Sequence, residues 1–573
     1  MKKGIKIIGI AIIILGLLFG ALFLMITHDE FVTIILGIVN LPEEKREELS
    51  EILTIRIFNG IRFIPLLISV CGIFIFLFSS QINSTVTSAK DWCYSVFAGL
   101  NKLPRSYLLF GVGIMVLSFL FNLYNVVNMP IFFDEVLTYQ HFTKRSIFTS
   151  ISHYPAPNNH ILHSALTNIT HYFPFSRTIN LRLPSLMVSL FSSLCFFYTF
   201  SKLLNVKIAV YLLSIYCFLF PVAYYGYLSR GYALVLLAFI ICFYSTMQLI
   251  ISREEKSSFK KYLVLLSTGS VIGFYAMPSF LYPYFAVSSF LSFYLILNKE
   301  VNKFLLFLVS VAITILIVIV LYLPIFLISG ISAVANNEYV EPISRLEVID
   351  QLIPHFSETS NFLFSIPLLG LLFVLVILSS IFFVKRLKSG IFPVYCILSA
   401  PIILLLHSVI PFPRTWVFLI IPFLFIIGLF AQEVNVNLNV NLKALMLFSL
   451  LSVSILVFNF RQQVKNIERF SFLARETADF LIRNKATTVY GNLALMATNL
   501  KYIFEEKNED IIVINLYEDT PSDTLVIPEK PSEYIITDKI IESGKGYKFV
   551  KEIGEEIFIS RLEQSNVQDY NIR

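Results

Sequence analysis

Two adjacent carboxylates, Asp134 and Glu135, follow a long apolar run within the sequence IFFDEVLTYQH, which begins at Ile131. A carboxylate inside a bilayer costs about 2.5–3.5 kcal/mol or more, so ionisable groups near membrane depth are candidates for function. A carboxylate at the membrane boundary could act as a general base for an incoming hydroxyl or amine. Alternatively, the pair only marks the lipid–water interface, where charges are common.

The segment 128–179, which contains this pair, is rich in groups that bind substrates or transfer protons. Five of the eight histidines lie in it, at positions 141, 153, 160, 163 and 171. His160 and His163 share a helical face, so with Asp134 and Glu135 they are candidate ligands of a divalent metal ion. The segment has no Asp-x-Asp motif, and hydrogen bonding or substrate contact is the commoner role of such histidines. The segment therefore indicates a reaction site, with a metal as a secondary interpretation.

The elements that position these groups must be membrane helices. The chain has 573 residues, of which 56% are hydrophobic and 14% charged, and its mean hydropathy is +0.76. Its apolar runs are continuous rather than alternating, which predicts α-helices rather than a β-barrel. The net charge of +6 is spread along the chain, so no nucleic-acid partner is expected. The six cysteines lack C-x-x-C spacing and are interpreted as small core residues.

About 13 segments are long enough to span a membrane. The first has a basic flank, and we interpret it as a retained helix rather than a signal peptide. The predicted spans lie near 5–27, 57–80, 106–127, 180–200, 207–222, 232–251, 262–277, 279–298, 304–329, 361–383, 390–410, 415–430 and 443–460.

The distribution of Lys and Arg predicts a cytoplasmic N-terminus, because the loops on that side are then short and basic. The extracytoplasmic segments are then 28–56, 128–179, 223–231, 330–360, 411–414 and all residues after Phe460.

Three regions follow from this division of the chain. Residues 1–104 form an N-terminal hairpin with loops, and 105–460 form the main transmembrane region. Residues 461–573 are denser in charge, and their pattern predicts a helix followed by strands. We expect a small soluble α/β domain there, outside the membrane, that caps the membrane region or docks the acceptor.

Several motifs occur in the order found in a known family. They are P-x3-DE-x3-Y (Pro130–Tyr139), PNNHILHS (Pro157–Ser164), LRLPSL (Leu181–Leu186), YLSRGYALVLL (Tyr227–Leu237) and PFPRTWVFLIIPFL (Pro411–Leu424). This set resembles the GT-C-fold glycosyltransferases that use polyprenyl-phosphate sugars. The nearest group contains the protein O-mannosyltransferases and the lipid A aminoarabinose transferase, and the resemblance covers roughly residues 105–460. Asn158, Asn159 and His160 lie where the aminoarabinose transferase pattern has Lys-Pro-Pro.

The resemblance implies an enzyme of the bacterial cytoplasmic membrane. It would move a sugar from a polyprenyl-phosphate donor in the bilayer to an extracytoplasmic acceptor, usually with inversion. Asp134 is the expected base, and Glu135 is the second choice or an orienting partner. Arg230 and Arg414 are expected at the donor phosphate, because a guanidinium can bind phosphate oxygens in a bidentate way.

Further substrate contacts are expected from Tyr139, Asn159 and His160. Two roles are equally favoured for Arg182, namely anchoring a loop and contacting the donor. Divalent metal dependence stays open, since relatives differ in it.

Two other classes of protein fit parts of the pattern. A transporter or flippase of lipid-linked glycans would explain the spans, but it predicts internal repeats and polar groups at mid-membrane. A polysaccharide polymerase or ligase predicts an Arg-rich outer loop between late spans, whereas 330–360 holds one arginine, Arg345.

Overall fold

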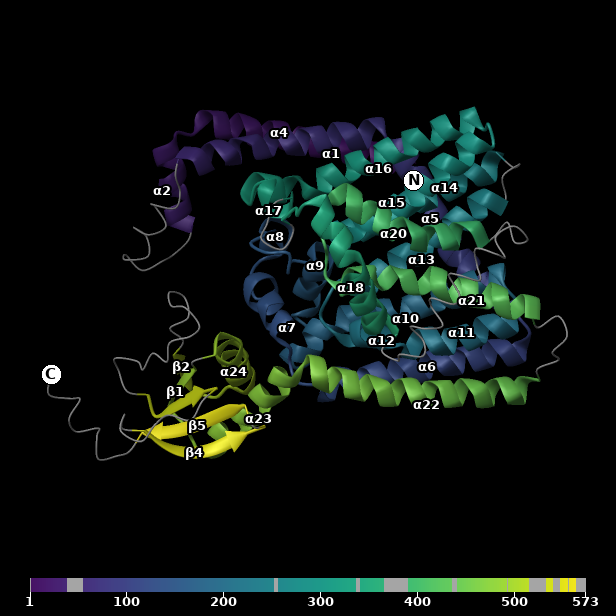
Figure 1. The fold of residues 1–573 in the computed structure, drawn as a ribbon. Coiled ribbons are helices and arrows are strands. Elements are labelled where there is room, and N and C mark those ends of the chain that lie inside the picture. Colours follow the sequence, from purple (N-terminus) through teal and green to yellow (C-terminus); the bar gives the residue numbers. More distant parts are fainter. Residues whose placement is uncertain are drawn as a thin grey trace.

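Most of the chain forms a thick bundle of helices, and a small sheet with two helices lies beside one end of it (Figure 1). The computed structural model describes residues 2–38, 55–251, 256–335, 341–364, 390–434, 441–491, 493–514, 532–538, 547–554 and 556–562. The helices α1 (Lys2–Met25) and α4 (Ile55–Leu77) pair along one flank of the bundle, and α22 (Leu442–Ile467) lies along the opposite flank. The helix α2 (His28–Ile38) follows α1.

The predicted class, a helical polytopic membrane protein with a C-terminal α/β part, is confirmed. Among the described residues, 8 helices are long and apolar enough to cross a membrane, or up to 10 if each of two bent pairs is one span. They include α1, α6 (Arg105–Asn128), α10 (Arg177–Leu203), α13 (Tyr232–Ile251), α16 (Val301–Ile328) and α22. Two more combine a 3-10 turn with a helix, namely η2 (Pro278–Phe280) with α15 (Leu281–Leu297) and η4 (Pro413–Leu419) with α21 (Ile420–Val434).

The count of about 13 spans is not confirmed. The helices α14 (Lys256–Ala276) and α20 (Ile391–His407) lie at predicted spans, but the latter has 17 residues. Most of the predicted span 361–383 lies outside the described residues. Most of the cytoplasmic segment expected between the predicted spans 57–80 and 106–127 forms the helix α5 (Ser79–Leu100).

Local sequence explains where several helices begin. The Ser176 side chain accepts a hydrogen bond from the Ile179 amide at the start of α10, and Asn441 accepts one from the Ala444 amide at the start of α22. Small polar side chains are favoured there because the first amides of a helix lack partners within it.

One predicted span, 207–222, is broken. The helices α11 (Val206–Phe218) and α12 (Phe220–Tyr227) meet at a 59° bend, where Leu219 is extended. Pro221 lies in the first turn of α12, the position that a residue without an amide hydrogen tolerates. The bend brings the end of α12 to the carboxylate pair.

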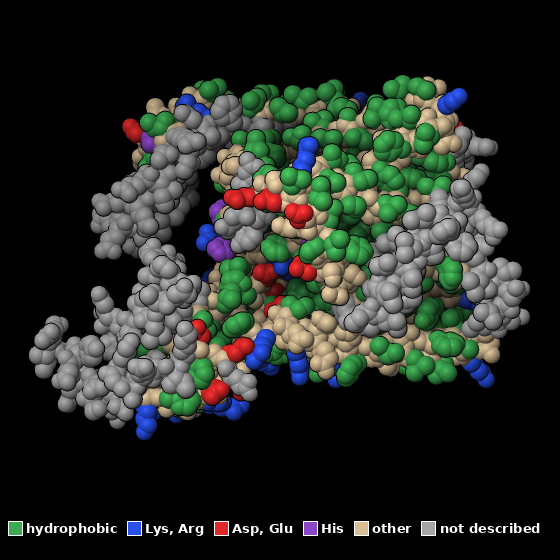
Figure 2. Space-filling model, viewed as in Figure 1, with side chains coloured by type: hydrophobic (Ala, Val, Ile, Leu, Met, Phe, Trp, Pro, Cys, Tyr) green, Lys and Arg blue, Asp and Glu red, His purple; other side chains and the backbone are tan. Residues whose placement is uncertain are grey.

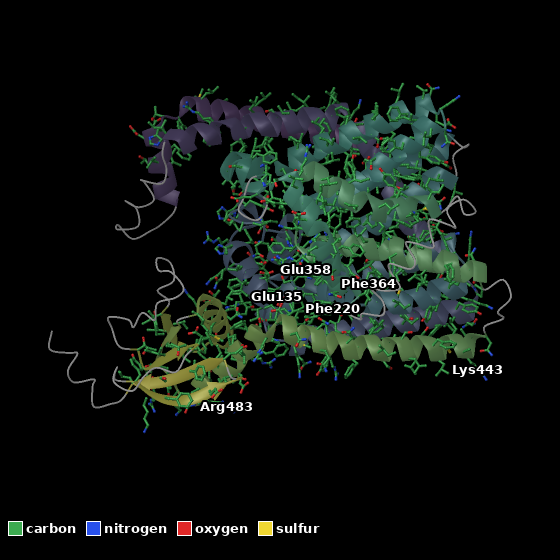
Figure 3. The ribbon with its side chains drawn as sticks, viewed as in Figure 1. Glu135, Phe220, Glu358, Phe364, Lys443 and Arg483 are labelled. Carbon is green, nitrogen blue, oxygen red and sulfur yellow. The ribbon has the colours of Figure 1, made fainter. Side chains whose placement is uncertain are left out.

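Short elements cover one end of the bundle. They are α7 (Phe133–Thr138), the π-helical turn η1 (Tyr139–Thr143), α8 (Ile147–Ser152), α9 (Ile161–Thr170) and α17 (Ser332–Ala335). The longer helix α18 (Arg345–Phe364) packs against η4, α12 and α20. We refer to the end that carries α7, α8 and α9 as the site end. Glu135 lies toward this end and Lys443, at the start of α22, lies at the other (Figure 3).

The C-terminal module consists of α23 (Arg469–Arg483), α24 (Ala494–Lys507) and five strands, and it lies at the site end. The strands are β1 (Thr488–Gly491), β2 (Ile512–Ile514), β3 (Tyr534–Thr537), β4 (Tyr547–Ile553) and β5 (Ile557–Leu562). Their order is β2-β1-β3-β5-β4. Strand β1 pairs in parallel with β2 and β3, whereas β5 is antiparallel to β3 and β4. The strands predicted from the sequence are all present, and α24 connects the parallel pair β1 and β2.

Candidate active site

The helix α7 presents the two carboxylates, and its first turn is fixed by Glu135 itself. The Glu135 Oε2 atom accepts a hydrogen bond from the Phe132 amide at 3.1 Å, and the Glu135 amide donates to the Phe132 carbonyl at 2.9 Å. This reciprocal arrangement supplies partners to amides that a helix start leaves unpaired. Asp134 and Glu135 then point to different surroundings.

Glu135 is fully buried and paired with Arg182 of α10. The Arg182 Nε and Nη2 atoms donate to the two carboxylate oxygens at 2.9 and 2.6 Å. The remaining guanidinium hydrogens go to the carbonyls of Val126, Met129 and Pro130 at the end of α6. A buried ion pair is stable only if its polar atoms have partners, and this network supplies them. It also ties α6, α7 and α10 together, and Arg182 has no exposed surface.

A turn at residues 228–231 is held against the same carboxylate. The Ser229 amide donates to Glu135 Oε1 at 2.8 Å, and the Ser229 hydroxyl lies 3.0 Å from His163 Nε2. His160 Nδ1 accepts from the Gly231 amide at 2.5 Å. A Cβ atom on Gly231 would lie 2.9 Å from His160 Cβ, so glycine permits this close approach.

The two histidines are neutral anchors. Burial, followed by the nearby Arg230 guanidinium, holds the pKa of His160 well below its usual range and lowers the pKa of His163 to about 3. A neutral imidazole can accept the hydrogen bond from Gly231, which an imidazolium cannot. Both rings therefore fix the turn that carries Arg230.

Asp134 lies beside Arg230 and keeps an exposed face. Its Oδ2 atom is 3.4 Å from Arg230 Nη2, and 41% of its side chain is exposed, against 4% for Arg230. Asn158 connects the two, since its side-chain oxygen accepts from Arg230 Nη1 and its amide donates to the Asp134 carbonyl at 3.4 Å. A carboxylate held by one long ion pair can exchange that partner for another.

Arg414 approaches the same point from η4. Its electrostatic partners are Tyr232, Tyr225 and Asp134, and its guanidinium lies over the Phe412 ring, 4.3 Å from the centroid. Asp134 thus forms an ion pair with Arg230 and lies within electrostatic range of Arg414, which comes from a separate part of the chain. Figure 2 shows acidic and basic side chains gathered in a recess toward the site end, while the flank of the bundle is hydrophobic.

Not every candidate from the sequence lies with Asp134. The Asn159 side chain is buried and donates to the carbonyls of Ser150 and His153 at 2.9 and 2.8 Å, so it closes a loop. Tyr139 is buried against the C-terminal module, where its ring meets Tyr502 edge to face at 5.3 Å.

The proposed metal ligands are not assembled. Among the described residues, no group of three or more His, Cys, Asp or Glu side chains is placed to hold a metal ion. Glu135 is occupied by Arg182, and His160 and His163 are directed at the turn 228–231. The spacing of the histidines placed both on one helical face but could not indicate these partners; in the structure His160 immediately precedes α9 and His163 lies in it.

A cavity of about 310 Å³ opens near η4. Its walls come from α18, α20 and η4, and they include Leu352, Leu363, Ile397, Ala400 and Trp416. The lining is almost entirely apolar, and the Trp416 indole donates to His355 Nε2 at 2.8 Å. Trp416 lies two residues after Arg414, so the cavity begins close to one of the two cations.

Two polar residues near the site were missed by the sequence reasoning. Asn158 lies directly before the candidate Asn159, and nothing in the sequence distinguishes the amide that reaches Asp134 from its neighbour. Glu468 follows the last predicted span and accepts a hydrogen bond from the Tyr224 hydroxyl. Its only sequence signal is an isolated carboxylate directly after a long apolar helix.

No protein-family model matches the chain, and no curated protein matches it in sequence. Among solved structures, the chain is similar to ArnT from Cupriavidus metallidurans in the apo state, with a TM-score of 0.48 and 10% identity over 80% of this chain and 98% of that one. It is also similar to ArnT from the same organism bound to undecaprenyl phosphate, with a TM-score of 0.48 and 9% identity over 81% and 99% of the two chains.

Proposed function

We propose that the chain is a membrane glycosyltransferase that moves a sugar from a polyprenyl-phosphate donor to an acceptor on the extracytoplasmic face. The observation that carries this proposal is the ion pair of Asp134, a partly exposed carboxylate, with Arg230, with Arg414 in electrostatic range, at one end of a membrane-type bundle. Such a group of side chains can bind a phosphate and remove a proton at neighbouring points.

The two arginines would hold the donor phosphate. An incoming phosphate can take the place of Asp134 at Arg230, since the ion pair is long and Asp134 is half exposed. Guanidinium groups suit a phosphate leaving group because their planar donors match its oxygens. The exchange would also release the carboxylate of Asp134 for its own role.

The apolar cavity supplies a place for the first isoprene units of the donor. It starts near Arg414 and lies between α18 and α20. A phosphate at Arg414 and a chain in this cavity would place the sugar on the side of Asp134.

Transfer then needs one proton movement and one exchange of bonds. The acceptor oxygen or nitrogen forms a bond to the anomeric carbon, and the bond from that carbon to the phosphate oxygen breaks. The electron pair of the broken bond stays on the polyprenyl phosphate, whose charge the arginines stabilise. The acceptor proton moves to Asp134, and displacement from the opposite side inverts the sugar.

Glu135 and Arg182 have a different task in this proposal. Their pair holds the start of α7 and the turn 228–231, so that Asp134 and Arg230 keep their relative positions. Arg182 is therefore assigned to anchoring rather than to donor contact.

The direct test incubates the purified protein in vesicles with a panel of polyprenyl-phosphate sugars. We expect one donor to yield free polyprenyl phosphate at a rate that depends on Asp134. Movement of the intact donor from one leaflet to the other without release of polyprenyl phosphate would point to transport instead. Absence of both from every donor in the panel would contradict the proposal.

A further inference from the structure

The junction between α22 and α23 carries a carboxyl group that the proposed reaction does not use. Glu468 is the single residue between the end of α22 and the start of α23, so it joins the membrane bundle to the C-terminal module. Its Oε1 atom accepts a hydrogen bond from the Tyr224 hydroxyl of α12, and its Oε2 atom accepts one from Ser471 at 3.2 Å. Among the residues that the structure describes, no Lys or Arg side chain forms a salt bridge with it.

Tyr224 connects this carboxyl to the start of α7. The Tyr224 ring is stacked on the Phe132 ring, with centroids 6.1 Å apart and 24° between the planes. Phe132 is the residue whose amide is bound by Glu135, one position before α7 begins. A short path of packed groups therefore runs from Glu468 to the helix that carries Asp134.

The C-terminal module also contacts the other end of this helix. Tyr502 of α24 packs against Tyr139, where α7 passes into η1, and Arg177 lies over both rings. Glu505 pairs with Arg177 and Lys144 at 3.4 and 3.2 Å. The module thus contacts α7 and η1 from both ends, and Glu468 is electrostatically coupled to both carboxylates.

We propose that Glu468 is a positioning residue that couples the C-terminal module to the site and weakens donor binding when it loses its proton. The proposal rests on the proposed function, because the ligand whose binding changes is the anionic polyprenyl-phosphate donor. Its basis is the contact with Tyr224, the position at the junction and the electrostatic coupling to Glu135 and Asp134.

The charge state of Glu468 is set by its surroundings. Burial, with further contributions from Glu135 and Asp134, raises the pKa of its carboxyl to about 7, although the hydrogen bonds from Tyr224 and Ser471 act in the opposite direction. The other charged groups nearby are occupied. Arg182 pairs with Glu135, Arg469 pairs with Glu556, and Arg475 donates to the Asn128 carbonyl. Loss of the proton therefore adds a negative charge with which no Lys or Arg of the described residues forms a salt bridge.

The test measures KM for the donor and kcat between roughly pH 6 and 8. In the wild type we expect KM to rise by about three- to tenfold as the pH passes 7, because the new negative charge on Glu468 repels the anionic donor through a partly screened protein interior. In Glu468→Gln, which keeps a hydrogen-bond acceptor for Tyr224, KM should stay at its low-pH value. The same rise in the variant would overturn the proposal.

Two further variants sharpen this experiment. Tyr224→Phe removes a hydrogen bond that lowers the pKa of Glu468, so the rise in KM should move to higher pH. Glu476→Gln makes the same chemical change at an exposed position on α23 and should keep the wild-type profile. An unmoved transition in Tyr224→Phe would show that another group is responsible.

A second readout does not depend on sugar transfer. The carboxyl of Glu468 has a higher pKa in the folded chain than the usual value for Glu. Its contribution to stability is therefore present at low pH and lost as the pH rises through about 7. The wild-type Tm should thus fall relative to that of Glu468→Gln as the pH rises from about 4.5, the ordinary pKa of Glu, to about 7, and should change little above that. A fall without any release of polyprenyl phosphate would mean that the proposed function fails while the titration of Glu468 stands, and parallel Tm curves would contradict the titration.

Discussion

Asp134 and Glu135 are neighbours in sequence, but only Asp134 has a face open to a substrate. Glu135 has no exposed area and has four hydrogen-bond donors around it, whereas Asp134 is 41% exposed and has one long ion pair. A general base has to reach the proton that it removes. The geometry therefore favours Asp134 for chemistry and Glu135 for structure.

Replacing Asp134 by Asn should remove the base while leaving the fold intact. We expect the rate of polyprenyl phosphate release to fall by at least about 10²-fold, with an unchanged melting temperature. The measurement is single-turnover release from the active donor. Asp91→Asn, at an exposed position on α5, should retain the wild-type rate. A normal rate in Asp134→Asn would exclude this residue as the base.

Removing the charge of Arg230 or Arg414 should weaken use of the donor. Either change to Gln should lower kcat/KM. The corresponding loss of transition-state stabilisation should be about 1.5–3 kcal/mol, the range for hydrogen bonds to charged groups. Lys should restore only part of this loss, because a point charge does not reproduce the planar fork of donors. Arg105→Gln, at an exposed position on α6, is the control. Full activity in both Gln variants would leave the two arginines as interface anchors.

At the scale of elements, the buried pair of Glu135 and Arg182 joins three helices. Glu135→Gln leaves the Arg182 guanidinium buried without its counter-charge, which typically destabilises a fold by about 3–5 kcal/mol. We therefore expect a clear drop in melting temperature, in contrast to Asp134→Asn. The double variant with Arg182→Gln should lose less than the sum of the single changes. An unchanged melting temperature in Glu135→Gln would contradict the anchoring role.

The apolar cavity between α18 and α20 should respond to the length of the donor. Ala400→Trp fills part of it, so KM should rise by tenfold or more for a long polyprenyl donor and little for a donor with two isoprene units, since each buried methylene contributes about 0.8 kcal/mol. Ile402→Trp, on the same helix at a residue that is 47% exposed, is the matched control. Equal effects on both donors would place the chain elsewhere.

Sequence patterns predicted those helices and strands whose positions follow from the distribution of apolar residues. The apolar runs gave the positions of α6, α10 and α16, and alternation in the tail predicted β4 and β5. The bend at Leu219 could not be found in this way, because the apolar run continues through it and only Pro221 marks the place.

The candidate site was only partly predictable for a related reason. Asp134, Arg230 and Arg414 were recognised as polar groups at predicted span ends, and the structure brings these three together. His160 and Arg182 were equally polar and equally placed, yet their partners are backbone atoms and a buried carboxylate. Such partners follow from tertiary packing, which the types and spacing of residues do not specify.

At the scale of the whole molecule, the segments predicted to share one membrane face lie together. The C-terminal module lies at the site end with α7, and Arg182 binds α7 to the end of α6 there, whereas Lys443, in the first turn of α22, lies at the other end (Figures 1 and 3). Donor lipid, base and acceptor must meet at one boundary for the proposed reaction, and this arrangement meets that requirement. Which side of the membrane the site end faces can be measured.

The distribution of Lys and Arg predicts that the site end faces outward. A cysteine at Lys548, an exposed position on β4, should then react with a membrane-impermeant thiol reagent in intact cells. A cysteine at Lys443, at the other end of the bundle, should react only after lysis. The parent chain for both is Cys93→Ser, because Cys93 is only partly buried. Labelling of Lys443→Cys in intact cells and protection of Lys548→Cys would reverse the orientation. The donor arginines and Asp134 would then face the cytoplasm, and the acceptor would have to be a cytoplasmic molecule.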